Sequence, residues 1–378
     1  MLNSLQYAGR DAAPGAVSQG PGLVWVRHLG IKDLRNINEA SVELHPGLNI
    51  FCGHNAQGKT SLLEAVGFVA RGRSFRTENS RSAIRRGAPM LHARAEAGKE
   101  GHFSALEVRV QPGRREFRVD GQQVSPREYQ GRLEAVVYST DRLRVIRGPM
   151  RERRQFLDRS AGALWPAYRT DVRAFERVLS QRNAALQEGA RDLPVWTERF
   201  LELGARLRLR RAEYAARLSA MLQRGFAPAG EEYEVLTRPA RVAAEADARS
   251  QLAGEIQSLQ RRERAVGRSL AGPHRDAVEL LLNGRDAALE ASSGQARSLL
   301  LALVLANLEV YREETGRNAI ALLDDLDSEL DQDRTHALCQ AAAGRTQALV
   351  TSAHPVWAES LRSRGQLFHV SDGKVQRA

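Results

Sequence analysis

The most constraining feature of this 378-residue sequence is a glycine-rich segment between an apolar run and a helical pattern. It has the form Gly53-x-x-x-x-Gly58-Lys59-Thr60, follows the apolar run 48–52 and leads into a helical pattern over 59–70. Glycines allow a tight turn in which several backbone amides face one phosphate, and the start of the helix adds about half a positive charge there. The alternative is an accidental glycine-rich turn, which the strand–turn–helix order disfavours.

In such a loop the lysine reaches the β- and γ-phosphates of a nucleotide, and the hydroxyl that follows it coordinates Mg²⁺. We therefore predict Lys59 as a phosphate ligand with a catalytic role and Thr60 as a metal ligand. Lys59 is one of only four lysines among 56 basic residues, which suggests that arginine would not serve at this position. The predicted nucleotide-binding residues of the loop are Gly53, His54, Asn55, Ala56, Gln57, Gly58, Lys59 and Thr60.

A second feature is an apolar run that ends in two carboxylates. The run 320–323 is followed directly by Asp324 and Asp325. In nucleoside triphosphatases a carboxylate at such a strand end holds Mg²⁺, and a second one can polarise the attacking water. We expect Asp324 to bind the metal and Asp325 to act as general base. Adjacent carboxylates repel one another without a cation, which implies magnesium, although a solvated acidic helix cap is the alternative.

A third feature, the segment Ser292-Ser293-Gly294-Gln295, stands just before a long apolar helix predicted over 294–314. A helix N-cap would explain the serines on their own. Together with the two motifs above, the segment resembles the signature of ABC-type ATPases, and residues 328–331 resemble the D-loop of that family. The resemblance implies that Ser292, Gly294 and Gln295 bind the γ-phosphate of ATP held by a second subunit, so that two copies enclose two ATP molecules, and it implies a catalytic role for Ser292.

Within the ABC-type ATPases, the chain is similar to the RecF family of SMC-like DNA repair ATPases. The resemblance extends from about residue 23 onward and implies that Arg35 and Asn36 lie near the adenine base. Four stretches carry it, namely 29–37 (LGIKDLRNI), 72–77 (GRSFRT), 147–159 (RGPMRERRQFLDR) and 271–276 (AGPHRD).

The same resemblance implies an activity and partners. We expect a weak, DNA-stimulated ATPase that works as a switch: ATP and Mg²⁺ drive formation of a homodimer that clamps gapped or junction DNA, and slow hydrolysis releases it. RecR and RecO are the implied protein partners, RecA loading is the implied purpose, and the implied location is cytoplasmic and nucleoid-associated. Two alternatives stay open: the ATPase subunit of a transport-type ABC system, and an SMC-type structural head, which requires a coiled coil that the sequence does not show.

Two positions need separate mention. Ala56 stands where the family usually has glycine, so we expect this position to avoid a positive φ angle. The γ-phosphate sensor follows the last predicted strand, 348–351. Thr351, Ser352 and His354 are all candidates, and the residues alone do not decide among them.

Pattern and composition together predict the organisation of the chain. A hydrophobic content of 42% excludes a mainly disordered chain. The longest apolar run, 299–306, is too short to span a membrane. With only two cysteines, Cys52 and Cys339, the chain cannot have a disulfide framework. We predict an α/β fold: an ABC-type P-loop ATPase head whose mixed β-sheet lobe is interrupted by a helical lobe. The predicted segments are a disordered extension 1–21, the ATPase lobe 22–148, a helical lobe 149–267 with little β pattern, and the rest of the ATPase lobe 268–378.

The basic residues indicate less than their number suggests. The net charge is +11, but nearly all the basic residues are arginine, and genome composition alone can produce such an excess. Four arginines crowd a helix start predicted at Gly148-Pro149, where each cation costs about 0.3–1 kcal/mol, and this points to an external anion such as DNA phosphate or to the other lobe. A solvated basic face is equally consistent. The four are Arg147, Arg151, Arg153 and Arg154.

Overall fold

The structure of the protein, a computed structural model, describes residues 23–77, 79–99, 101–226, 230–239, 243–325 and 346–378. The predicted extension 1–21, the predicted D-loop 328–331 and Cys339 lie outside the described residues. The chain forms two compact units. Unit 1 comprises the residues up to 143 and from 304 onward, and unit 2 comprises residues 144–303.

Unit 1 contains an antiparallel sheet with the strand order β2-β1-β4-β5-β6-β7. Side chains alternate between its two faces, so that in β4 the residues Leu91, Ala93, Ala95 and Ala97 are buried while those between them are more exposed. One face of the sheet therefore contributes to the core. The strands are β1 (Trp25–Leu34), β2 (Ile37–Glu43), β4 (Leu91–Lys99), β5 (His102–Gln111), β6 (Arg114–Val119) and β7 (Gln122–Val124).

The second sheet of unit 1 has the order β15-β14-β3-β13-β12-β8 and is parallel except for the edge strand β15. Every residue of β3, β8, β12 and β13 is buried, as expected for parallel strands covered on both faces. The strands are β3 (Leu48–Cys52), β8 (Ala135–Tyr138), β12 (Ile320–Leu323), β13 (Ala348–Ser352), β14 (Gly365–Ser371) and β15 (Lys374–Arg377).

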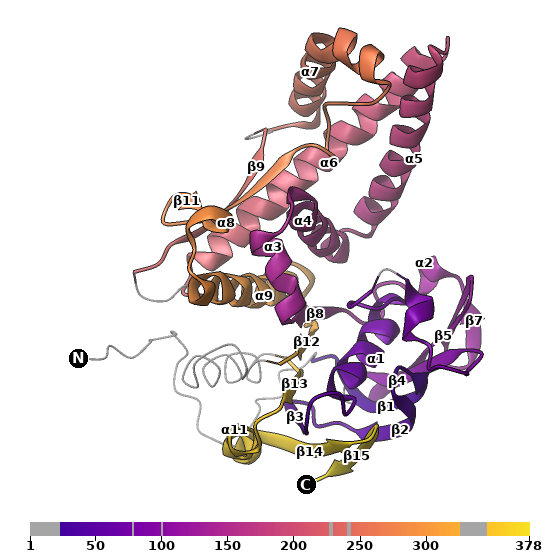
Figure 1. Ribbon diagram of the computed structural model, residues 1–378, viewed down its shortest axis with the longest axis vertical. Coiled ribbons are helices and arrows are strands. Elements are labelled where there is room, and N and C mark those ends of the chain that lie inside the picture. Colours follow the sequence, from indigo (N-terminus) through magenta and orange to yellow (C-terminus); the bar gives the residue numbers. More distant parts are fainter. Residues whose placement is uncertain (1–22, 78, 100, 227–229, 240–242, 326–345) are drawn as a thin grey trace. The chain divides into compact units, whose positions relative to one another are not determined.

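Helix α1 (Lys59–Arg71) lies between the two sheets of unit 1 and contacts β1, β4 and β5 of one and β8 and β13 of the other (Figure 1). Eleven of its 13 residues are buried, which explains why its sequence is apolar nearly all round. The short helix α11 (Pro355–Ser360) packs against β3 and β13. The remaining short elements of unit 1 are η1 (Ser80–Ala83), α2 (Pro126–Tyr129), η2 (Thr140–Leu143) and η3 (Arg362–Arg364).

Unit 2 is built from long helices and a small antiparallel sheet with the order β11-β10-β9. Helix α6 is its centre, because α5, α7, α4 and β9 all pack against it. The long helix α9 begins in unit 2 and ends in unit 1. The elements are α3 (Arg144–Arg147), α4 (Met150–Leu164), α5 (Pro166–Glu188), α6 (Leu193–Leu222), β9 (Tyr233–Arg238), α7 (Glu245–Val266), β10 (Ala277–Leu282), β11 (Arg285–Asp286), α8 (Ala287–Glu290) and α9 (Ser293–Thr315).

Buried arginines organise the interior of unit 2. Arg182 donates to Glu263 at 2.7 Å, and both side chains are at most 3% exposed. Arg208 forms a two-point contact with Asp276, at 2.7 and 2.9 Å, and Arg211 forms one with Asp158. The planar guanidinium matches a carboxylate at two points, which lysine does not, so part of the arginine excess serves the fold.

Several sequence-based expectations agree with the structure, and others differ from it. The strands predicted over 48–52 and 320–323 have these bounds in the structure. The strand ending at 351 is not the last one, because β14 and β15 follow it and complete the sheet beside β3. The helical segment also contains a strand, β9, which pairs with β10. This pairing places residues 268–303 with the helices in unit 2, whereas the sequence-based boundaries assign them to the ATPase lobe.

Candidate functional site: a P-loop beside an acidic strand end

The glycine-rich loop contains two residues with a left-handed backbone. Gly58 has a φ angle of 113° and Ala56 one of 65°, so the expectation that Ala56 avoids a positive φ is wrong. The left-handed conformation costs an L-residue about 1–2 kcal/mol, and a neighbouring side chain helps to hold it. Asn36 Nδ2 donates a hydrogen bond to the carbonyl oxygen of Ala56 at 2.9 Å.

The side chain of Lys59 is hydrogen-bonded to the backbone of its own loop. Its ammonium donates to the carbonyl oxygens of Gly53 at 2.6 Å and of His54 at 2.9 Å, and the residue is only 7% exposed. A compact cation held against the loop backbone is placed to meet an anion that enters the loop. Cys52, which precedes the loop, is a buried strand residue.

The structure brings Thr60 and Asp324 together, as the sequence analysis predicts for a shared metal site. Oδ1 of Asp324 accepts hydrogen bonds from Thr60 Oγ1 at 2.9 Å and from Thr351 Oγ1 at 2.7 Å. Burial raises the pKa of Asp324 above its ordinary value, and the hydrogen bonds from Thr351 and Thr60 oppose that rise. A hydroxyl and a carboxylate are the hard oxygen ligands that Mg²⁺ prefers, so these residues fit that ion.

The backbone after the strand turns sharply at Asp325, which has a φ angle of 56° and is partly exposed. Its amide donates to Thr351 Oγ1 at 2.8 Å. Of the three candidate sensors, Thr351 is buried and tied to both aspartates, whereas Ser352 Oγ accepts from the amide of His354 at 3.0 Å. His354 is the exposed N-cap residue of α11. The identity of the γ-phosphate sensor stays a prediction.

Arg35 and Asn36 occupy the turn between β1 and β2, next to the P-loop helix. The Arg35 guanidinium contacts both carboxylate oxygens of Glu64, at 2.9 and 3.0 Å, and Glu64 is fully buried in α1. Ser74 also donates to Glu64, within the segment 72–77 that resembles the RecF family. Glu64 was not among the predicted site residues, although a lone acid among apolar helix residues is a recognisable signal. Adenine contact by Arg35 and Asn36 stays a prediction.

The hairpin of β14 and β15 reaches the P-loop through its turn. The amide of Gly373 donates to the carbonyl oxygen of Gln57 at 2.9 Å, and the amide of Asp372 donates to Gln57 Oε1 at 2.6 Å. A Cβ at Gly53 would collide with the carbonyl oxygen of Val370, so β14 also touches the start of the loop. No strand was predicted after residue 351, so this contact was not expected from the sequence.

The signature segment forms the N-terminus of α9, on unit 2. Gln295 N donates to Ser292 Oγ at 3.2 Å, and Ser292 N donates to Gln295 Oε1 at 3.0 Å, which is a reciprocal capping box. Ser292 and Gly294 are exposed. The helix cap that would by itself explain the serines of this segment is therefore present. Binding of ATP by the segment stays a prediction.

The four arginines near the start of α4 have different environments. Arg153 is 2% exposed and donates to the backbone carbonyls of Ile146 and Val278 and to Asp286, so it does not lie on a surface open to DNA. Arg154 is half-buried and donates to the carbonyl of Asp276. Arg147 is exposed and donates to the carbonyl of Ala291 at 3.0 Å, beside the signature segment. Arg151 is exposed in the first turn of α4.

The described residues contain no group of three or more histidine, cysteine, aspartate or glutamate side chains that could hold a metal by themselves. No helix in the described part of the chain is long and apolar enough to cross a membrane.

Comparison with known proteins places the chain. A sequence model described as "RecF/RecN/SMC N terminal domain" matches residues 25–376. A relative from Symbiobacterium thermophilum, named DNA replication and repair protein RecF, is 36% identical over 343 residues, which cover 87% of this chain and 91% of the relative. This chain belongs to the RecF family.

Solved structures agree with the assignment to the RecF family. A structure described as the recombination mediator protein RecF with ATP in the RecFOR pathway has a TM-score of 0.87 and 25% identity, covering 96% of this chain and 99% of that one. An SMC head bound to the C-terminal winged-helix domain of ScpA is 15% identical, with a TM-score of 0.53 over 94% of this chain. The SMC head therefore shares the fold alone, and the resemblance to the RecF family and the ABC-type head fold are confirmed.

Proposed function

We propose that this RecF-family chain is a Mg²⁺-dependent ATPase of DNA replication and repair, in which ATP controls a homodimer that clamps gapped or junction DNA. The observation that carries the ATPase part is the contact of Thr60 with Asp324 beside Lys59. Bound Mg²⁺ would supply charge neutralisation on the β- and γ-phosphates. Thr60 and Asp324 hold the metal, Lys59 and the loop amides hold the phosphates, and Asp325 takes the proton of the attacking water.

The exposed signature segment supports the homodimer. Ser292 and Gly294 lie at an exposed helix N-terminus, where the helix dipole and the amides favour an anion. In the proposed cycle this N-terminus binds the γ-phosphate of ATP held by a second copy. RecR and RecO are the proposed protein partners and RecA loading the proposed purpose, with a cytoplasmic, nucleoid-associated location, because the matching solved RecF is described as part of the RecFOR pathway.

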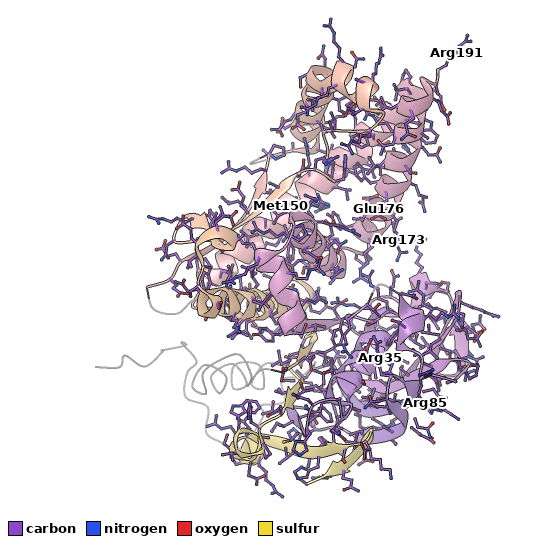
Figure 2. All side chains as sticks on the ribbon, viewed as in Figure 1. Arg35, Arg85, Met150, Arg173, Glu176 and Arg191 are labelled. Carbon is purple, nitrogen blue, oxygen red and sulfur yellow. The ribbon has the colours of Figure 1, made fainter. Side chains whose placement is uncertain are left out.

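For the DNA contact we propose a surface on unit 2 that the sequence analysis did not identify, here called the α7-end surface. It comprises the exposed Arg261, Arg262, Arg264 and Arg268 at the end of α7 and Arg191 in the turn between α5 and α6. None of the five has an ion pair within the described residues. The two segments are neighbours, because a Cβ at Gly267 would meet Gln187 of α5, and Figure 2 shows Arg191 projecting outward from the α5–α6 turn. Guanidinium groups match phosphate oxygens at two points.

Sedimentation velocity with and without ATP and gapped DNA tests the proposed cycle. We expect ATP to dimerise the wild type, Lys59→Met to abolish ATP binding, Ser292→Arg to bind ATP but stay monomeric, and Asp325→Asn to accumulate as the ATP-bound dimer. Ser250→Arg makes the same change at an exposed position on α7 and should dimerise normally. A wild type that stays monomeric under all conditions contradicts the homodimer. ATPase stimulation by lipid vesicles rather than by DNA would favour a transport-type subunit.

A further inference from the structure

The hairpin of β14 and β15 touches the P-loop at both of its ends. Near the start of the loop, the carbonyl oxygen of Val370 occupies the place that a Cβ at Gly53 would need. Near the end of the loop, Gln57 accepts two hydrogen bonds from the hairpin turn, one on its backbone oxygen from Gly373 and one on its side-chain oxygen from Asp372. The five-residue stretch from 53 to 57 is therefore held at two points by one element.

The turn that makes these contacts has little conformational freedom. Asp372 and Gly373 have φ angles of 48° and 74°, the left-handed pair that a two-residue hairpin turn requires. Gly373 is buried, and a Cβ at this position would lie 2.9 Å from the carbonyl oxygen of Asn36 and 3.2 Å from Cα of Ile37. Only glycine fits there, and the donors to Gln57 are backbone amides whose direction the turn fixes.

Asn36 connects the hairpin turn to the rest of the loop. Its amide donates to the carbonyl oxygen of Ala56, and its side-chain oxygen accepts from Ser61 at 3.2 Å. Gly58, with a φ angle of 113°, packs between the side chain of Asn36 and Gly373. The two residues with positive φ, Ala56 and Gly58, thus stand on either side of Gln57, and all three contact Asn36 or the hairpin turn.

We propose that the turn between β14 and β15 is a latch that holds the P-loop in its phosphate-binding conformation, with Gln57 and Gly373 as positioning residues for ATP. The proposal rests on the ATPase function proposed above and deepens it. A loop that is already shaped before ATP arrives does not spend binding free energy on ordering its amides, so the latch raises nucleotide affinity. The chemical step, which depends on Asp324, Asp325 and Mg²⁺, does not use the latch.

Two pairs of variants test the latch. Gln57→Ala removes the side-chain acceptor on the loop, and Gln376→Ala makes the same change on an exposed residue of β15 in the same hairpin. Gly373→Ala adds the colliding Cβ to the turn. Its control is Gly121→Ala, in the Asp120-Gly121 turn between β6 and β7, where φ is 80° and nothing lies within 4 Å of the added Cβ.

Direct ATP binding, steady-state ATPase kinetics and thermal unfolding without nucleotide are measured for each variant. A hydrogen bond contributes a factor of about 2 to 10, so we expect Gln57→Ala to raise the Kd and KM for ATP about fivefold with kcat unchanged, and Gly373→Ala to raise them at least as much. The double variant should bind ATP no worse than Gly373→Ala alone, since both changes release the same latch. The two controls should bind ATP like the wild type.

The latch proposal is wrong if folded Gln57→Ala binds ATP like the wild type. It is also wrong if Gln57→Ala and Gly373→Ala weaken ATP binding independently, because Gln57 would then contact the nucleotide directly. Should Gly373→Ala fail to fold, Gln57→Ala against Gln376→Ala decides the matter. A loss of kcat with unchanged KM also contradicts a positioning role. Failure of the proposed ATPase function is a different result, in which the wild type itself binds no ATP.

Discussion

The hydroxyl of Thr60 donates a hydrogen bond of 2.9 Å to Oδ1 of Asp324, although the two residues are 264 positions apart. This bond and the one from Thr351 help to compensate the burial of the carboxylate. Mg²⁺ would be held by the same two side chains, Thr60 and Asp324, and would supply positive charge beside the phosphates of a bound nucleotide. The same pair therefore contributes to the stability of the fold, and its role with Mg²⁺ stays a prediction.

Replacing Asp324 by asparagine should separate these two roles. Asparagine keeps an oxygen that can accept from Thr60 and Thr351 but removes the buried charge, so we expect the free energy of unfolding without nucleotide to stay equal or rise by up to about 1 kcal/mol. ATP hydrolysis should fall at least about 100-fold, because the metal loses its carboxylate ligand. Urea denaturation and a phosphate-release assay measure the two effects. Wild-type hydrolysis in this variant would exclude Asp324 as a metal ligand.

Ala56 offers a test of the strained loop. Glycine adopts a φ of 65° without steric cost but adds freedom to the unfolded chain, so Ala56→Gly should change the free energy of unfolding by less than about 1 kcal/mol. Ala56→Val should destabilise the protein by about 2 kcal/mol or more and weaken ATP binding, since a β-branched side chain does not tolerate this conformation. Urea denaturation and ATP titration of both variants check this. Equal stability of the valine variant would mean that the loop is not strained at Ala56.

His274 predicts a pH dependence of stability. Burial lowers its pKa to about 4, against an ordinary value of 6.5. A depressed pKa means that the folded state favours the neutral ring. The contribution of His274 to the free energy of unfolding is therefore complete above pH 6.5, and it is lost as the pH falls toward 4, by up to about 1.4 kcal/mol per pH unit.

Urea denaturation between pH 4 and pH 7 measures this loss. In His274→Gln the loss over that window should be smaller than in the wild type, whereas His102→Gln, at an exposed position, should leave it unchanged. Identical pH profiles for the wild type and His274→Gln would show that other groups control acid sensitivity.

Substitution of Arg182 tests how much the buried arginine–carboxylate pairs of unit 2 contribute to the free energy of unfolding. Arg182→Met leaves Glu263 buried without its partner, which should cost about 3–5 kcal/mol of unfolding free energy. The matched change Arg199→Met breaks an exposed pair with Glu202 and should cost less than about 1 kcal/mol. Replacing Arg182 and Glu263 together by methionine should recover much of the loss. Thermal denaturation measures all three, and equal losses for the two single variants would contradict a structural role of burial.

If DNA binds to the α7-end surface, its arginines should set how DNA binding depends on salt concentration. Changing Arg261, Arg262 and Arg264 to glutamine should weaken binding of duplex DNA and reduce the slope of log K against log salt by about 0.9 for each DNA phosphate that the variant no longer neutralises. The control carries the same loss of charge at three arginines that already have acidic neighbours on their own segments, namely Arg199, Arg210 and Arg362. Fluorescence anisotropy at several salt concentrations measures the slope. An unchanged slope in the α7-end variant would place the DNA elsewhere.

The elements of unit 1 that were predicted best are those that a single contiguous stretch of sequence determines. The strand 320–323 is a short, wholly apolar run, which is the pattern expected of a parallel strand covered on both faces. Lys59, Thr60 and Asp324 were predicted from motifs that combine a strand, a turn and specific side chains, and the structure brings all three together.

What the sequence did not reveal depends on contacts between distant residues. Strand β14 mixes Gln366 and His369 with apolar residues, and its place beside β3 follows only from the folded sheet. The positive φ of Ala56 is stabilised by Asn36 from another turn, so local propensity alone gave the wrong expectation. Arg153 belongs to a basic run in the sequence, yet its partners in the fold bury it.

The strand order of the parallel sheet has a consequence for synthesis on the ribosome. Strand β3, which leads into the P-loop, lies between β13 and β14, and both of these neighbours are translated roughly 300 residues after it. At a translation rate of about 5–20 residues per second, the nascent loop spends at least about 15 seconds without either flanking strand. Unit 2 can complete its own core during that interval, so this chain should emerge with its inserted part folded before its nucleotide site is formed.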